Sequence, residues 1–87
     1  MRILILYRPN SEHERLVEEF IANYRRKYPT QIDTEDIDSR EGIATASLYD
    51  IVQYPAILVL KDDGSLQSYW QGPELPLSEE VASYANN

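Results

Sequence analysis

Two uninterrupted apolar runs constrain the fold of this chain more than any other feature. They are Ile3–Tyr7 and Ala56–Leu60, and both consist mainly of residues that favour strands. A strand that is apolar at every position is buried on both faces, as happens inside a sheet that is covered on each side. A chain of 87 residues has room for one small domain. We therefore expect a single domain over residues 1–87, built around these two strands.

The segment after the first run predicts a helix. Arg8–Asn10 breaks the strand pattern, and Ser11 and Glu14 then have the spacing of a capping box in which Ser11 is the N-cap. Proline has no backbone N–H to continue a helix, so the helix should end before Pro29. Apolar residues recur between these limits at helical spacing, at Leu16, Val17, Phe20, Ile21, Tyr24 and Tyr28.

Residues 30–38 form a weaker strand pattern. Ile32 and Ile37 are five positions apart, so they face opposite sides of a regular strand. Either helices cover both faces of the sheet, or a bulge shifts the phase between the two isoleucines. Charged side chains protect an edge strand from pairing with another chain, and this segment carries Asp33, Glu35, Asp36 and Asp38.

A second helix is expected from Arg40 to about Ile51. Ser39 has a side chain suited to the N-cap position that precedes it. Gly42 should weaken the first turn, because glycine loses more backbone freedom in a helix than other residues do.

The end of the chain predicts a hairpin and a short helix. Asp63-Gly64 is typical of a hairpin turn, and Ser65–Gln71 is the returning strand. Ser78 should cap a last helix from Glu79 to about Tyr84. The final two residues, 86–87, are expected to fray.

The elements thus occur in the order β-α-β-α-β-β-α. The first two strands are joined by a helix, so they should be parallel with a right-handed crossover. The last two should form an antiparallel hairpin. The sequence predicts an α/β fold with a four-stranded mixed sheet and helices on both of its faces.

The stretch from Ala46 to Gly64 has a distinctive spacing. Ala46, Tyr49, Ile51 and Pro55 fall at the intervals of an Ala-x-x-Tyr-Gly-Val-x-x-x-Pro signature, with Asp50 where the glycine would be. An apolar strand, a Lys-Asp-Asp-Gly turn and a second strand closing on Gly72 then follow. In these features the chain resembles the thioredoxin family. The resemblance implies a minimal thioredoxin-like fold.

The resemblance also implies where a site would lie. Pro55 would be the family's cis-proline, which sits beside the redox loop, and the backbone before it pairs with bound peptide or glutathione. In glutaredoxins the loop leads into a Cys-x-x-Cys pair at the start of the first helix. Ser11 and Glu14 stand at those two positions here, or Glu12 and Arg15 if the alignment shifts by one.

The chain contains no cysteine. Disulfide exchange needs a thiolate nucleophile, and a serine hydroxyl with no evident general base does not replace one. We therefore expect no catalytic residue, no thiol–disulfide oxidoreductase activity and no cofactor. No metal site is expected either, because His13 is the only histidine and a single histidine between acids is a weak signal for metal.

The formal net charge of −7 argues against two classes of partner. Nucleic acids and anionic membranes attract basic patches. The only basic run, Arg25–Lys27, lies at the end of a predicted helix, where it complements the helix dipole. No segment resembles an export signal or approaches the roughly 20 apolar residues of a membrane span. A cytoplasmic location is therefore expected.

The leading hypothesis is a non-redox, protein- or peptide-binding module that uses the former active-site groove. The candidate groove residues are Arg8, Pro9, Asn10, Ser11, His13, Tyr54, Pro55 and Gly72. Two alternatives stay open. One is a glutathione-binding, transferase-like enzyme that only orients the thiol of its substrate. The other is a KaiB-like regulatory protein, because that class shares the fold and the missing cysteines.

The strand Ser65–Gln71 offers a further surface. It carries no charge, and uncharged edge strands invite pairing with another chain, so a weak homodimer through this strand is left open. Tyr69 and Trp70 point to opposite faces of it. Either one packs under the last helix and the other is exposed, or both pack locally.

Overall fold

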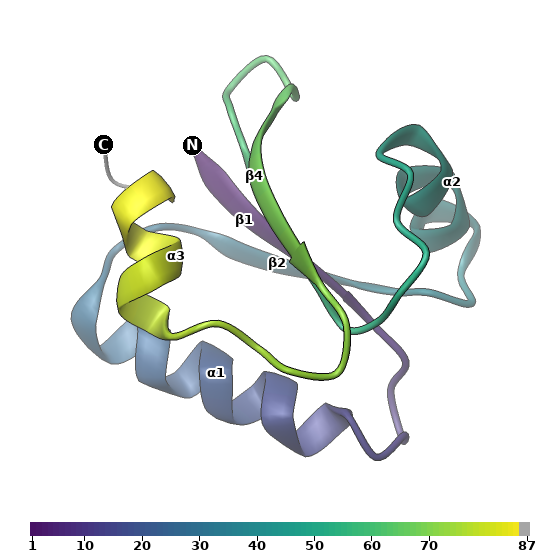
Figure 1. Cartoon of the computed structure of the whole chain (residues 1–87), viewed down its shortest axis with the longest axis horizontal. Helices are drawn as coiled ribbons and strands as arrows, with labels where there is room; N and C mark the ends of the chain where they lie inside the picture. The colour runs from purple at the N-terminus through teal and green to yellow at the C-terminus, as the bar shows by residue number, and fades with distance from the viewer. Residues whose placement is uncertain (86–87) are drawn as a thin grey trace.

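The computed structural model describes residues 1–85 (Figure 1), so the expected fraying of residues 86–87 lies outside the described part. The elements follow the expected order β-α-β-α-β-β-α and are β1 (Arg2–Tyr7), α1 (Glu14–Lys27), β2 (Ile32–Asp36), α2 (Arg40–Leu48), β3 (Ala56–Leu60), β4 (Leu66–Gln71) and α3 (Ser78–Ala85). The last helix includes Ser78, which the sequence placed just before it. The predicted fold class and strand positions are therefore confirmed.

The two apolar runs lie side by side at the centre of the sheet. The strand order is β2-β1-β3-β4. β1 is parallel to β2 and antiparallel to β3, and β3 and β4 form the antiparallel hairpin. The sheet is thus mixed, and both β2 and β4 are edge strands. Every residue of β3 is buried, as its uninterrupted apolar sequence predicts.

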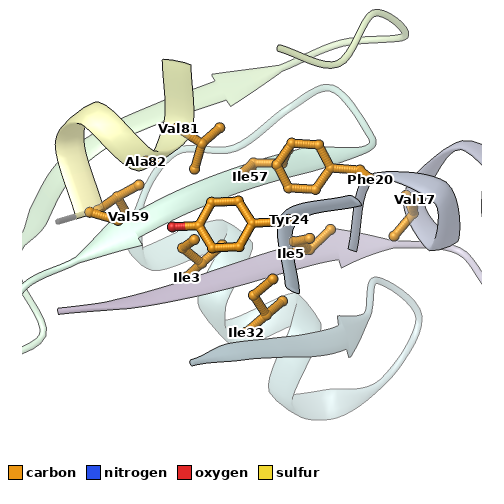
Figure 2. Close-up of a cluster of buried hydrophobic side chains, with 11 residues drawn as sticks. Ile3, Ile5, Val17, Phe20, Tyr24, Ile32, Ile57, Val59, Val81 and Ala82 are labelled. Carbon is orange, nitrogen blue, oxygen red and sulfur yellow. The ribbon is translucent and has the colours of Figure 1, made fainter. Parts of the chain in front are cut away.

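Helices cover both faces of the sheet. α1 and α3 lie against one face, which we call the α1 face, and α2 lies against the other, the α2 face (Figure 1). Figure 2 shows Tyr24 of α1 among the side chains of the α1 face, where it is 0% exposed. Ile32 packs in this cluster, whereas Ile37 packs against the cluster on the α2 face. Coverage of both faces therefore explains the spacing of the two isoleucines.

α1 begins later than the capping-box pattern predicts. Its first residue is Glu14, and the N-cap position is occupied by His13, whose side chain makes no capping hydrogen bond. Ser11 instead closes a turn ahead of the helix: its hydroxyl donates to the Arg8 carbonyl and accepts from the His13 N–H at 3.2 Å. The prediction that Ser11 is the N-cap is therefore wrong. The same side chain stabilises a turn, which is the alternative that serine offers to a helix start.

α2 begins where it was expected and ends three residues early. The Ser39 hydroxyl accepts from the Gly42 N–H at 3.0 Å, so Ser39 is the N-cap. The helix stops at Leu48 rather than Ile51 because Asp50 adopts a left-handed conformation, with φ of 56°. The Ile51 N–H then bonds back to the Ala46 carbonyl at 2.8 Å, which closes the end of the helix.

Gly42 has a packing role that its sequence position did not reveal. A Cβ atom at this position would lie 2.0 Å from the backbone oxygen of Asp36, at the end of β2. The absence of a side chain therefore lets the first turn of α2 approach the sheet closely.

Trp70 and Tyr69 follow the first of the two arrangements that the sequence left open. Trp70 lies under α3, with its ring edge-on to Tyr84 at 5.6 Å between centroids, and its Nε1 donates to a Glu80 carboxylate oxygen at 3.2 Å. Tyr69 is 46% exposed. It lies opposite Leu58, which belongs to the cluster on the α2 face.

Replacing Gly42 with alanine should destabilise the protein by about 1–3 kcal/mol, the usual cost of forcing extra atoms into a packed site. In an ordinary helix the same change stabilises by about 1 kcal/mol. Ala44 is exposed in the same helix, so Ala44→Gly serves as the control and should lose only about 1 kcal/mol. Urea denaturation followed by circular dichroism measures both. A neutral or stabilising Gly42→Ala would contradict the close approach of α2 to β2.

Removing the hydroxyl of Ser11 or Ser39 should cost about 1 kcal/mol of unfolding free energy in each case. For Ser11 the loss comes from the turn before α1, and for Ser39 from the cap of α2. Ser47, exposed on α2, is the control, and its replacement by alanine should change stability by less than about 0.5 kcal/mol. Equal effects of Ser11→Ala and Ser47→Ala would show that the turn contributes nothing.

Candidate functional site

The sheet topology brings the two predicted halves of the site together. β1 and β3 are antiparallel, with Leu6 opposite Ala56, so the loop after β1 and the segment before β3 meet at one end of the sheet. The loop contains the predicted residues 8–13, and the segment contains Tyr54 and Pro55. Two regions that are far apart in sequence thus form one surface.

A cleft of about 300 Å³ lies at this surface, and we call it the Tyr54 cleft. It is lined by Arg8, Ser11, Glu12, His13, Ile37 and Tyr54. The remaining predicted groove residues do not line it; they are Pro9, Asn10, Pro55 and Gly72. Glu12 and Ile37 line the cleft although they were not among the predicted groove residues. One feature of the sequence could have indicated Ile37: it is an apolar residue directly after an acidic strand, and it faces the side opposite to Ile32.

Pro55, directly after Tyr54, and Gly72 are joined to each other in the fold. Both are buried, the Tyr54–Pro55 peptide bond is cis, and the Gly72 N–H donates to the Pro55 carbonyl at 3.2 Å. Gly72 has a φ of 120°, a conformation that side-chain-bearing residues rarely adopt. The Gln71 side chain accepts from the Gln53 N–H at 3.1 Å, which fixes the residue before Tyr54.

The backbone of Tyr54 has no hydrogen-bond partner in the part of the chain that the structure describes. Its side-chain hydroxyl donates to the Ile51 carbonyl at 3.4 Å. Within residues 1–85, however, no hydrogen bond reaches its backbone N–H or carbonyl, because β3 pairing starts at Ala56. Residues 53–55 form a bend before β3, and unpartnered main-chain groups beside a cleft can bind an extended chain through hydrogen bonds.

The loop that forms the other wall is held by local contacts. Arg8 Nε lies 3.0 Å from Asp38 Oδ2, which ties the loop to the end of β2. Both side chains are more than half exposed, so this ion pair fixes geometry more than it adds stability. Asn10 has a φ of 61°, a left-handed conformation that asparagine tolerates better than most residues. His13 Nε2 lies 3.5 Å from a Glu12 carboxylate oxygen.

Tyr7, the residue that precedes the loop, lies near several carboxylates. Burial raises the pKa of Tyr7, at the end of β1, and the carboxylates of Glu14, Glu18 and Asp36 raise it further. Thioredoxin-type chemistry needs the reverse, because a nearby positive charge lowers a thiol pKa. Ser11 cannot substitute for a thiol in this setting, since its hydroxyl donates to a backbone carbonyl, which is a poor general base.

Two other classes of site, a metal centre and a membrane span, are not found among the described residues. No group of three or more histidine, cysteine, aspartate or glutamate side chains there could hold a metal ion. No helix among residues 1–85 has the length and apolar character needed to cross a bilayer.

A larger hollow lies away from the predicted site. It has a volume of about 570 Å³ and runs between α1 and the loop that leads to α3. Its lining consists of Leu16, Glu19, Phe20, Asn23 and residues 73–78. This hollow could not be predicted from a local pattern, because its shape depends on the path of residues 73–78 across α1.

Comparison with known proteins identifies the fold. No protein-family model and no curated protein sequence matches the chain. Among solved structures, thioredoxin 1 from the thermophilic eubacterium Thermosipho africanus matches with a TM-score of 0.71 and 12% identity, over 99% of this chain and 91% of the other. Thioredoxin O2 from Arabidopsis thaliana, in its oxidised state, matches with a TM-score of 0.70 and 16% identity, over 94% and 69%.

A malarial protein matches with a TM-score of 0.67 and 12% identity, over 97% of this chain and 91% of that one. At such identities the likeness concerns the fold and not the activity. It agrees with the strand order, with the mixed sheet and with the resemblance around Ala46–Gly64. The chain therefore has a thioredoxin-like fold, and it has that fold without a single cysteine.

Proposed function

We propose that this protein is a non-redox binding module that holds an extended peptide of a partner protein in the Tyr54 cleft. The observation that carries the proposal is the unpartnered backbone of Tyr54 beside the cleft. An extended peptide placed along it would gain main-chain hydrogen bonds to the Tyr54 N–H and carbonyl. Pro55 and Gly72 are buried, so the segment is held in place before any ligand arrives.

The cleft lining suggests the kind of peptide. Ile37 and the ring of Tyr54 offer apolar surface for one side chain of the ligand, and Ser11 and His13 add polar groups. Glu12 is 88% exposed at the cleft and disfavours acidic side chains. We therefore expect an extended segment with an apolar residue at its centre and no acidic residue beside it.

The same charges make glutathione a weaker candidate. Glutathione is an anion at neutral pH, with two carboxylates and one amine. Arg8 is the one permanent cation in the lining of the Tyr54 cleft, and it is already paired with Asp38. A glutathione carboxylate would have to compete with Asp38 for Arg8 and lie near Glu12. The charge arrangement thus favours a neutral or basic peptide over the transferase-like alternative.

Peptide binding can be tested with ligands selected from a random-peptide phage library. In ¹⁵N NMR titrations, selected peptides should shift the amide signals of Arg8, His13 and Tyr54, and reduced glutathione should leave them unchanged. Arg8→Glu places a carboxylate against Asp38 and opens the cleft wall, so it should weaken peptide binding by roughly tenfold or more. Arg15→Glu is the matched charge reversal, because Arg15 is 87% exposed and, among residues 1–85, forms an ion pair only with Glu19.

The control variant should bind peptides as the native chain does. Two results would refute the proposal. One is a set of selected peptides that shifts only signals around the hollow between α1 and residues 73–78. The other is full binding by Arg8→Glu.

A second measurement addresses the absence of thiol chemistry. The purified protein should not accelerate the reduction of insulin disulfides by dithiothreitol, because no residue can form the mixed disulfide through which exchange proceeds. A bacterial thioredoxin assayed in parallel serves as the positive control. Turnover above the uncatalysed rate in a pure sample would count against a non-redox role.

A further inference from the structure

The two edges of the sheet are defended differently. β2 carries Asp33, Glu35 and Asp36, and such charges discourage pairing with another strand. β4 carries none, and no charged residue occurs anywhere from Gly64 to Pro73. Because the chain has a net charge of −7, an edge strand without charged residues differs electrostatically from the acidic edge β2.

The outer backbone of β4 has no strand partner among the described residues. Along an antiparallel pair, alternate residues point their N–H and carbonyl groups toward the partner strand. Gly72 donates to Pro55, so Gly72 faces β3, and Trp70, two positions earlier, faces it too. The backbone groups of Tyr69 and Gln71 therefore point away from β3. Within residues 1–85 no backbone bond reaches them.

Apolar side chains are exposed beside this edge. Tyr69 lies on the α2 face and is 46% exposed, and Val52 is 76% exposed. The Gln71 side chain accepts from the Val52 N–H at 3.0 Å, so the Val52 loop lies against the end of β4. Asp50 is the only charged residue between Gly42 and Leu60. The segment that contains the Val52 loop is therefore nearly neutral as well.

A patch without charge at its centre can meet an identical patch without repulsion between like charges. In a two-fold dimer the same patch meets itself, so each charge at the centre faces its own copy. In an acidic protein, a surface without acids near the axis avoids this repulsion between like charges. The edge β2 fails this condition, and the hollow between α1 and residues 73–78 fails it through Glu19 and Glu74. The β4 edge meets it.

We propose that β4 pairs with β4 of a second copy of this chain, in an antiparallel two-fold contact that joins the two sheets. Tyr69 of each copy lies opposite Gln71 of the other, which gives about four main-chain hydrogen bonds from the two outward-facing pairs. The two Tyr69 rings are then diagonal neighbours on the α2 face, within the reach of aromatic side chains. The irregular register between Val59 and Leu60 lies toward the start of β4, outside these pairs.

This surface shares no lining residue with the Tyr54 cleft, so the proposal stands apart from peptide binding. Sedimentation analysis of the full chain from micromolar to millimolar concentration should reveal a reversible monomer–dimer equilibrium. Added salt should strengthen it, because screening reduces the repulsion between two acidic copies. In NMR hydrogen exchange, the Tyr69 and Gln71 amides should become slower to exchange as concentration rises.

Tyr69→Glu should weaken dimerisation by roughly tenfold or more, because it sets two carboxylates close together across the axis. Leu77→Glu is the matched control: Leu77 is 72% exposed and lines the hollow beside α1, not the edge of β4, and the variant has the same net charge. It should dimerise like the native protein. Circular dichroism checks that both variants fold, and the exchange measurement needs no variant at all.

Three outcomes would overturn the proposal. The first is a single monomer mass over the whole concentration range. The second is an association that weakens as salt is added, or that continues beyond a dimer. The third is equal dimerisation of Tyr69→Glu and Leu77→Glu, or exchange at Tyr69 and Gln71 that does not depend on concentration.

Discussion

The antiparallel pairing of β1 and β3 is the interaction on which the rest of the structure depends. Both strands are buried on both faces, so the pair is stable only when helices cover each side, and α1, α3 and α2 supply that cover. The direction of the pairing also sets the site. Because β1 ends where β3 begins, the loop after Tyr7 and the residues before Ala56 converge at one end of the sheet. The Tyr54 cleft is a consequence of strand direction.

Much of the fold could be predicted because its strongest signals are local. The apolar composition of β3 is confined to Ala56–Leu60, and those are the observed limits of the strand. The helix boundaries were less certain, because one pattern can support two local structures. Ser11 has the spacing of an N-cap but forms a turn. α2 ends because Asp50 adopts a left-handed conformation, which the composition of the helix does not predict. From the sequence alone, Gly42 only lowers the stability of the helix. Its packing role becomes visible once β2 is known to lie beside it.

The candidate site was predicted in part, and the division has a physical cause. Residues in the β1–α1 loop and around Pro55 follow from the family resemblance, since they lie at the ends of core strands. Ile37 joins the cleft through the packing of β2 against β1, a contact that no short pattern encodes. The Arg8–Asp38 pair joins residues that are thirty positions apart for the same reason. Tertiary contacts of this kind appear only once the sheet order is known.

The position of Trp70 gives the protein an internal optical reporter. It is the only tryptophan in the chain, and it bridges β4 to α3 through the Tyr84 ring and the Glu80 carboxylate. Indole emission responds to solvent and to neighbouring carboxylates. Light absorbed by the seven tyrosines can pass to this single acceptor. The fluorescence of the protein therefore reports on the contact between Trp70 and α3. Detachment of the last helix would therefore change the emission spectrum even while the rest of the sheet stayed intact.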